Sequence, residues 1–236
     1  MNSARIPKHV AIVLDGNRRF AGEKGLNRFD GHIFGAKKLE EVIGWCQELG
    51  IKHITVYAFS TENFTRNEEE VKILMDLMTN KFKEVVKDPR VHKYRIRVKA
   101  IGDLGSLPDQ VQRAIDEAQE ATRTYDGHTL NIAVGYGGRA ELAEAVRKIC
   151  NHIEKGEIST NDVDENLISR HLYTAGLPDP DLIIRTSGEE RLSGFLLWQS
   201  AYSELYFCEA NWPAFSKIDF LRAIRTYQGR ERRFGK

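Results

Sequence analysis

Segments with two different hydrophobic periods alternate along the chain, and this alternation constrains the fold more than any other feature. Apolar residues such as Val71, Leu74, Met75 and Met78 recur every three or four positions, which is typical of a helix with one buried face. Between such segments, short runs with strand character lie at residues 9–15, 51–59, 94–102, 130–134, 181–185 and 204–207. This order predicts an α/β fold, with a mostly parallel six-stranded sheet and helices on both of its faces.

Length and cysteine content narrow the class of protein. The chain has 236 residues, 41% of them hydrophobic, so we expect a single domain over residues 1–236 with a sizeable core. Cys46, Cys150 and Cys208 lie far apart, which disfavours a disulfide framework or a cysteine zinc site and fits a reducing compartment. We see no signal peptide and no run of about 20 apolar residues that would span a bilayer. A soluble, cytoplasmic protein is therefore expected, and peripheral contact with a membrane stays compatible with the sequence.

The charge balance and the lack of nucleotide motifs disfavour a nucleic-acid or nucleotide-binding module. The 35 basic and 34 acidic residues give a net charge of +1, so overall charge cannot hold a nucleic acid. The chain contains no G-x-x-x-x-G-K-[ST] motif, and its opening has no G-x-G-x-x-G. A local basic pocket for a small anion remains compatible with this composition.

Polar residues follow four of the predicted strands, at the edge where ligands bind in parallel sheets. A carboxylate such as Asp15 can hold Mg²⁺, and Gly16 lets the backbone approach an anion closely. Arginines bind phosphate oxygens with two hydrogen bonds at once. One carboxylate with several arginines suits a diphosphate better than a sugar or an amino acid. The four clusters are residues 15–20, 60–66, 135–139 and 185–193, and the arginines in question are Arg19, Arg28, Arg66, Arg185 and Arg191.

Each of these features also has an ordinary structural interpretation. An Asp-Gly pair after a strand is usually a turn, and a single arginine is usually a solvated surface residue. Residues 135–138 fit a simple strand-to-helix turn equally well. Residues 71–85 fit a core face, His32 a helix start, and the basic residues at 230–233 a solvated chain end. The joint occurrence of four polar clusters, each after a strand, favours a binding site.

Five motifs, in order along residues 9–235, resemble the cis-prenyltransferase family, typified by undecaprenyl diphosphate synthase. They are HVAIVLDGNRRF at 9–20, Gly31-His32 with Gly35-Ala36, YAFSTENFTR at 57–66, DLIIRTSGEERLSGFLLWQSAYSELYF at 181–207 and RERRFG at 230–235. The resemblance implies an apolar tunnel and a Mg²⁺-dependent condensation, in cis geometry, of an allylic prenyl diphosphate with isopentenyl diphosphate, releasing diphosphate. It also implies a homodimer in which the C-terminal segment reaches the neighbouring site.

The resemblance further assigns a role to individual residues. Asp15 and Glu204 would be the magnesium-linked carboxylates. Asn63 is assigned near proton removal, although a neutral amide is a poor base and the released diphosphate or a water is a better acceptor. The allylic diphosphate would be bound by Gly16, Asn17, Arg18, Arg19, Arg28 and His32, and the prenyl pocket would be lined by Phe20 and Phe64. The second diphosphate would be bound by Arg66, Arg185, Arg191 and Ser193. The remaining substrate-binding residues would be Ser60, Thr61, Glu62 and Leu192.

Some residues depart from the family pattern. Asn67 stands where proline is usual, Gly135 where asparagine is frequent, and Ser187 where glycine is frequent, while Phe34 is bulky for its helix. Residues 79–81 (Thr-Asn-Lys) interrupt the apolar face of the helix that walls the tunnel. We therefore expect a short or medium product, shorter than an undecaprenyl chain.

Two alternatives stay open within the resemblance. The acceptor could be another allylic diphosphate or an alcohol, or the chain could be a non-catalytic partner subunit. Retention of Asp15, Arg19, Asn63, Arg185 and Glu204 argues against the second alternative.

Overall fold

The structure is a computed structural model in which residues 5–230 are described. Its six strands form one parallel sheet in the order β3-β4-β2-β1-β5-β6. All six predicted strands are present, and their ends differ from the prediction by at most two residues. The strands are β1 (His9–Val13), β2 (His53–Ser60), β3 (Ile96–Ile101), β4 (His128–Tyr136), β5 (Leu182–Arg185) and β6 (Glu204–Phe207).

Several of the helices begin at side chains that cap their free N–H groups. Asn27 caps α2, Asn67 caps α3 by accepting from the N–H of Glu69, and Ser216 caps α8. The capping role of Asn67 explains how the helix starts here without the usual proline. The α-helices are α1 (Asn17–Glu23), α2 (Arg28–Glu48), α3 (Glu68–Val85), α4 (Pro89–Lys93), α5 (Asp109–Ala121), α6 (Gly138–Glu154), α7 (Glu165–His171) and α8 (Lys217–Gln228); short 3₁₀ turns are η1 (Thr61–Thr65), η2 (Leu104–Ser106), η3 (Thr160–Asp162) and η4 (Trp212–Ala214).

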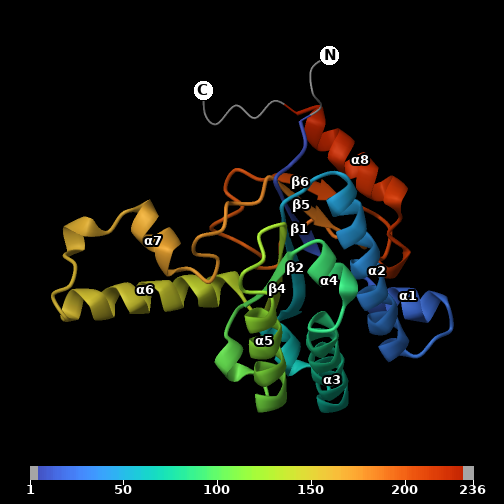
Figure 1. Ribbon diagram of the computed structural model, residues 1–236, viewed down its shortest axis with the longest axis horizontal. Coiled ribbons are helices and arrows are strands. Elements are labelled where there is room, and N and C mark those ends of the chain that lie inside the picture. Colours follow the sequence, from blue (N-terminus) through green and yellow to red (C-terminus); the bar gives the residue numbers. More distant parts are fainter. Residues whose placement is uncertain (1–4, 231–236) are drawn as a thin grey trace.

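The two faces of the sheet are covered differently. Side chains alternate between the faces along each strand, so Val10 and Ile12 of β1 pack with α2, α3, α5 and α8. Ala11 and Val13 face the other way, toward Phe195 in the segment that follows β5. The expected helices on both faces are therefore found mainly on one, because residues after β5 cover the second and α6 and α7 project away from the sheet (Figure 1).

A cavity of about 880 Å³ lies between α2, α3 and the sheet. It runs from Asp15, beyond the end of β1, to Ile96 at the start of β3. Leu39 of α2 and Met78 of α3 are among the apolar side chains on its walls. The apolar tunnel expected from the sequence is confirmed. None of the helices in residues 5–230 combines the length and hydropathy needed to cross a lipid bilayer.

Candidate active site

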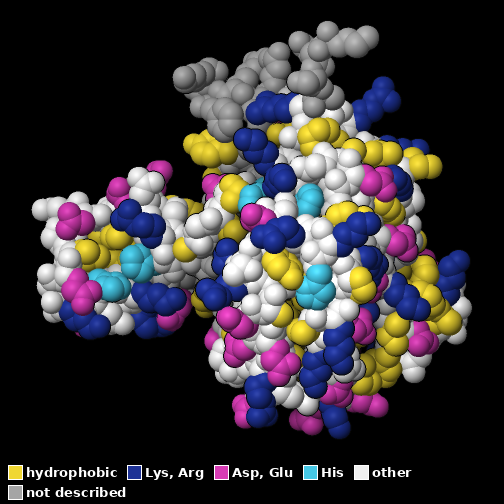
Figure 2. Space-filling model, viewed as in Figure 1, with side chains coloured by type: hydrophobic (Ala, Val, Ile, Leu, Met, Phe, Trp, Pro, Cys, Tyr) yellow, Lys and Arg dark blue, Asp and Glu magenta, His cyan; other side chains and the backbone are white. Residues whose placement is uncertain are grey.

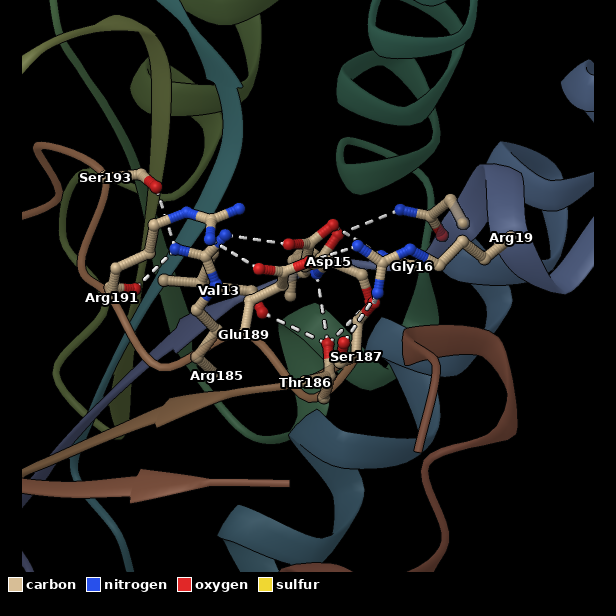
Figure 3. A network of polar contacts seen from close by, with 12 residues as sticks. Val13, Asp15, Gly16, Arg19, Arg185, Thr186, Ser187, Glu189, Arg191 and Ser193 are labelled. Atoms are coloured by element: carbon tan, nitrogen blue, oxygen red, sulfur yellow. Dashed lines mark hydrogen bonds and ion pairs between the residues drawn. The ribbon is translucent and has the colours of Figure 1, made fainter. Parts of the chain in front are cut away.

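Asp15 and Arg185 form the centre of the site, at the C-terminal edge of the sheet. Arg185 ends β5 and is only 4% exposed. Its Nη2 donates to Oδ2 of Asp15 at 2.8 Å, and its Nη1 donates to the carbonyl of Arg191 and to Oγ of Ser193. Because a charge buried to this extent needs partners, these oxygens hold the guanidinium in one orientation (Figure 3). Its buried Nε has no hydrogen-bond partner within residues 5–230, so one donor remains for a ligand.

Backbone hydrogen bonds fix Asp15 against the neighbouring strand. The hydroxyl of Thr186 accepts from the N–H of Asp15 at 3.0 Å and is 2.7 Å from its carbonyl oxygen. The N–H of Gly16 donates to Oδ1 of Asp15 at 2.7 Å. Gly16 has φ of 97°, in the left-handed region that favours glycine, and a Cβ there would lie 2.4 Å from Oδ1 of Asn211. The turn that aims Asp15 therefore requires glycine.

A second ionic group extends the site toward solvent. Nη1 of Arg19 donates to the carbonyl and the hydroxyl of Ser187, and its Nη2 pairs with Glu189. Glu189 also pairs with Arg191, so one carboxylate bridges two guanidinium groups (Figure 3). The hydrogen bond from Arg19 lowers the pKa of Glu189, and the same bond raises the pKa of Arg19. The guanidinium groups of Arg19 and Arg191, bridged by one carboxylate, thus lie on the solvent side of Asp15 and Arg185.

A third charged group, after those around Arg185 and Glu189, lies at the start of α3. Glu70 is 7% exposed, and its Oε1 accepts from Nη1 of Arg66 at 2.8 Å. Arg18 and His32 approach the same carboxylate at 3.9 Å and 3.7 Å. Burial and the charge of Arg66 lower the pKa of His32, so its ring is neutral at pH 7. A carboxylate among three nitrogen groups marks a place where an anion is stabilised.

The sequence analysis missed Glu70, Glu189 and Thr186 as site residues. Thr186 and Glu189 lie within the motif quoted at residues 181–207, so the motif itself carried the signal. Glu70 lies four residues after Arg66 at the start of a helix, a spacing that allows an ion pair.

Several predicted residues meet at the mouth of the cavity and others do not. Phe20 packs edge-on against Phe34, and Phe64 packs against Phe59. Neither Phe20 nor Phe64 is among the described residues that line the cavity, and their place in the prenyl pocket stays a prediction. Arg28 is exposed at the first position of α2, and the contacts described for residues 5–230 do not link it to Asp15. The predicted residues that line the cavity are Asp15, Asn17, His32, Ser60, Glu62, Asn63, Arg66, Arg185 and Ser193; Gly16, Arg18, Arg19, Thr61, Arg191 and Leu192 lie in the adjoining loops and helix start.

The loop after β2 is shaped by its own side chains. Oδ1 of Asn63 accepts the N–H of Ser60 at 3.0 Å, in a reciprocal cap of the 3₁₀ turn η1. This bond occupies the oxygen that would take a proton. Asn63 therefore shapes the loop, and its place near proton removal stays a prediction.

The chemistry of Asp15 fits a magnesium ion, but Glu204 does not join it within one chain. Mg²⁺ is held by one or two carboxylates together with substrate phosphates, and the partly exposed Asp15 would supply the first. Glu204 begins β6, level with Leu182 and Val10, and pairs with Arg230 at 2.8 Å. Asp15 lies five residues beyond Val10, about 16 Å along the strand direction. Asp15 and Glu204 of one chain therefore cannot hold the same ion, because they lie at opposite ends of the strands, and the role of Glu204 as a magnesium-linked carboxylate stays a prediction.

The departures from the family pattern have local explanations. Ser187 has φ of 79° and Gly135 has φ of 57°, both in the left-handed region. Glycine and asparagine adopt this conformation most easily, so both suit position 135. Phe34 is exposed on α2 and reaches Phe20, so its bulk does not fill the cavity.

Comparison with known proteins agrees with this geometry. Residues 13–235 match the family model described as putative undecaprenyl diphosphate synthase. Two proteins named tritrans,polycis-undecaprenyl-diphosphate synthase (geranylgeranyl-diphosphate specific) are each 55% identical to this chain. The match to the protein of Methanocaldococcus jannaschii covers 98% of this chain and 83% of that protein. The match to the protein of Thermococcus kodakarensis covers 100% of this chain and 89% of that protein. The crystal structure of lavandulyl diphosphate synthase from Lavandula x intermedia in complex with dimethylallyl diphosphate superposes with a TM-score of 0.94 at 38% identity, covering 98% of this chain and 99% of that one. The chain therefore belongs to the undecaprenyl diphosphate synthase family of cis-prenyltransferases.

Proposed function

We propose that the protein is a Mg²⁺-dependent cis-prenyltransferase that joins an allylic prenyl diphosphate to isopentenyl diphosphate and releases diphosphate. The observation that carries the proposal is the ion pair between the buried Arg185 and the partly exposed Asp15 at the mouth of an apolar cavity of about 880 Å³. Charged groups at one end of an apolar cavity match a substrate with a diphosphate head and a hydrocarbon tail.

The starter and product are proposed from the relatives. Their names specify geranylgeranyl diphosphate and an undecaprenyl product. We propose the same pair here, a medium-length product that exceeds the limit expected from residues 79–81. That expectation treated all three residues as obstacles in the tunnel. Thr79 instead donates to the carbonyl of Met75 at 2.9 Å and Asn80 points to solvent, so only Lys81 reaches the cavity.

The side chains at the mouth act on the leaving group. Ionisation breaks the allylic C–O bond, and the electron pair stays on the diphosphate. Arg19 and the free Nε of Arg185 would donate to the oxygens on which charge develops. Asp15 would hold Mg²⁺, which neutralises diphosphate charge when bound. The double bond of isopentenyl diphosphate then supplies the new C–C bond, and the lost proton goes to released diphosphate or water.

A second copy of the chain and the cell compartment belong to the same proposal. The projecting α6 exposes Val146, and Val163 is exposed in the segment that follows it, as apolar surface that a homodimer could cover (Figure 1). Residues 231–236, which include most of the C-terminal motif, lie outside the described residues.

The free cysteines support a reducing, cytoplasmic location, with residues 1–236 as one domain.

Peripheral contact with a membrane has its best support near the cavity mouth. Leu26, Ile33 and Phe34 are exposed around the start of α2. Hydrophobic side chains gather on this side of the molecule, over α1 and the start of α2 (Figure 2). A surface of this kind could lie against the membrane that receives a polyprenyl product.

Product analysis with labelled isopentenyl diphosphate tests the proposal. Dimethylallyl, geranyl, farnesyl and geranylgeranyl diphosphates are compared as starters, with and without a chelator. We expect magnesium-dependent product from geranylgeranyl diphosphate, of undecaprenyl length by chromatography. Product from an allylic diphosphate alone, or with an alcohol, would indicate a different acceptor. No release of diphosphate with any starter would indicate a non-catalytic partner subunit.

A further inference from the structure

Ser187 has a backbone conformation that is unfavourable for serine. It lies two residues beyond the end of β5 with φ of 79°, in the left-handed region, and the next residue, Gly188, has φ of 70°. In turns whose two central residues both have positive φ, asparagine, aspartate and glycine are preferred at the first position. A Cβ is disfavoured there because it crowds the following carbonyl oxygen. The chain therefore keeps a serine where glycine would be less strained.

The surrounding backbone holds this turn in place. The N–H of Ser187 donates to the carbonyl of Ala210 at 2.8 Å, and the N–H of Gly188 donates to the carbonyl of Cys208 at 2.9 Å. Ser187 is also only 5% exposed. Because these bonds would break if the turn changed its shape, the fold imposes the left-handed conformation on the serine.

The hydroxyl of Ser187 meets Arg19 across the site. Nη1 of Arg19 donates to Oγ of Ser187 at 2.6 Å and to its carbonyl oxygen at 2.7 Å, while Nη2 pairs with Glu189 (Figure 3). The side chain of Arg19 is 52% exposed, and a long exposed side chain samples many rotamers unless several bonds hold it. Within residues 5–230, Ser187 accepts two of the three hydrogen bonds that fix this guanidinium.

Ser193 repeats this arrangement beside the other arginine of the site. It has φ of 49°, and its Oγ accepts from Nη1 of Arg185 at 2.8 Å. Four residues other than glycine have positive φ within residues 5–230, and two of them are serines whose hydroxyls hold a site arginine. Strained residues of this kind cluster at functional sites. The repeated arrangement indicates that each hydroxyl has a use that offsets the strain.

We propose that Ser187 is a positioning residue, whose hydroxyl fixes Arg19 in the orientation that stabilises the departing diphosphate; this inference rests on the proposed function. Charge grows on the diphosphate only as the allylic C–O bond ionises. A guanidinium that is already held in place stabilises this charge without reorganising. A mobile guanidinium still attracts the bound substrate, so loss of the hydroxyl should lower kcat more than it raises KM.

Ser187→Gly and Ser187→Ala test the proposal, because both lack the hydroxyl and only the second keeps the strain. Ser187→Gly should melt about 2 °C above Ser187→Ala, since glycine adopts the left-handed conformation freely. Activity should not follow this difference. Both variants should lose about tenfold in kcat with geranylgeranyl diphosphate, with an unchanged KM for isopentenyl diphosphate. A normal kcat in either variant would overturn the proposal.

Arg95 offers a matched control for the backbone. It has φ of 49° and is exposed between α4 and β3, away from the site. Arg95→Gly should likewise melt above Arg95→Ala, and both should keep the kcat of the unmodified protein. A loss of kcat here as large as in the Ser187 variants would show that activity follows stability, and would contradict the positioning role.

Side-chain relaxation tests the role of Ser187 without catalysis. The ¹⁵N order parameter of the Arg19 Nε–H group, assigned with Arg19→Lys, reports motion of the guanidinium on the picosecond to nanosecond timescale. We expect it to fall below about 0.6 in both Ser187 variants and to stay unchanged in the Arg95 variants. An unchanged value in the Ser187 variants would refute the proposal even if no protein makes product. A lower value without product from any starter would support the positioning role while refuting the proposed function.

Discussion

The apolar cavity is lined by ion pairs at its mouth and again between the helices of its wall, yet the two groups are built in different ways. At the mouth, Arg185 and Asp15 stand at the ends of adjacent parallel strands and are held by backbone groups. Farther along the wall, Glu40 and Arg90 extend from helices, and the side chain of Arg90 is 58% exposed. Backbone-held charges keep a fixed geometry, whereas helix-borne charges in water are held loosely. The comparison indicates that the mouth is built to hold reacting groups in one place, whereas the ion pairs between the helices are free to rearrange.

Removing Asp15 should produce the largest effect and would most directly break this comparison. In Asp15→Ala the proposed metal ligand and the partner of Arg185 are both lost. We expect diphosphate release to fall about 1,000-fold. The exposed Asp116→Ala on α5 is the matched control and should keep normal activity. Activity of Asp15→Ala within a few-fold of the unmodified protein would show that the mouth is not the reaction centre.

The second largest effect should be a difference in stability between variants at the mouth and variants on the helices of the wall. Arg185→Met leaves Asp15 beside an apolar chain and should lower the free energy of unfolding by about 3 kcal/mol. Arg90→Met removes a guanidinium that is mostly exposed and should cost less than about 1 kcal/mol. Urea unfolding of both variants measures the contrast. Equal losses would contradict the distinction between backbone-held and helix-borne charges.

Glu70 sharpens the comparison because its carboxylate lies where an anion is stabilised. Glu70→Gln keeps the shape but leaves Arg66 without a charged partner, and should cost about 2 kcal/mol of stability. Added inorganic diphosphate should restore more stability to this variant than to the unmodified protein, because the anion replaces the carboxylate. Thermal unfolding with and without diphosphate measures this, with the exposed Glu68→Gln as control. An equal diphosphate effect in both variants would place the anion elsewhere.

The smallest expected effect is a pH dependence from His32. Its pKa is lowered in the folded chain by burial and then by Arg66, so the unfolded chain binds a proton first as the pH falls below 6.5. His32 therefore contributes a loss of stability between pH 6.5 and its lower folded pKa. His32→Asn should lose less stability than the unmodified protein between pH 7.5 and pH 5.5 in urea unfolding. Equal losses would show that His32 does not sense the charges at the mouth.

Local patterns predicted much of the fold and part of the site. The strand at residues 204–207 and the helix that contains Val71, Leu74, Met75 and Met78 were predicted closely, because hydrophobic period acts over a few residues. The polar residues after β1 and β5 were expected to meet, and Asp15 and Arg185 do so because parallel strands end at one edge. Phe20 and Phe64 could not be placed in the same way, since the direction of a ring depends on the neighbours it packs against.

The sequence by itself determined which residues form strands and helices, and which family motifs carry the carboxylate and the arginines. Only the tertiary structure decided that Glu204 lies at the opposite edge from Asp15, that Glu70 binds Arg66, and that Lys81 meets Glu40 across the cavity. The physical reason is the distance along the chain over which each interaction acts. Hydrophobic period and capping depend on residues within a few positions, whereas an ion pair between helices depends on how those helices pack on the sheet.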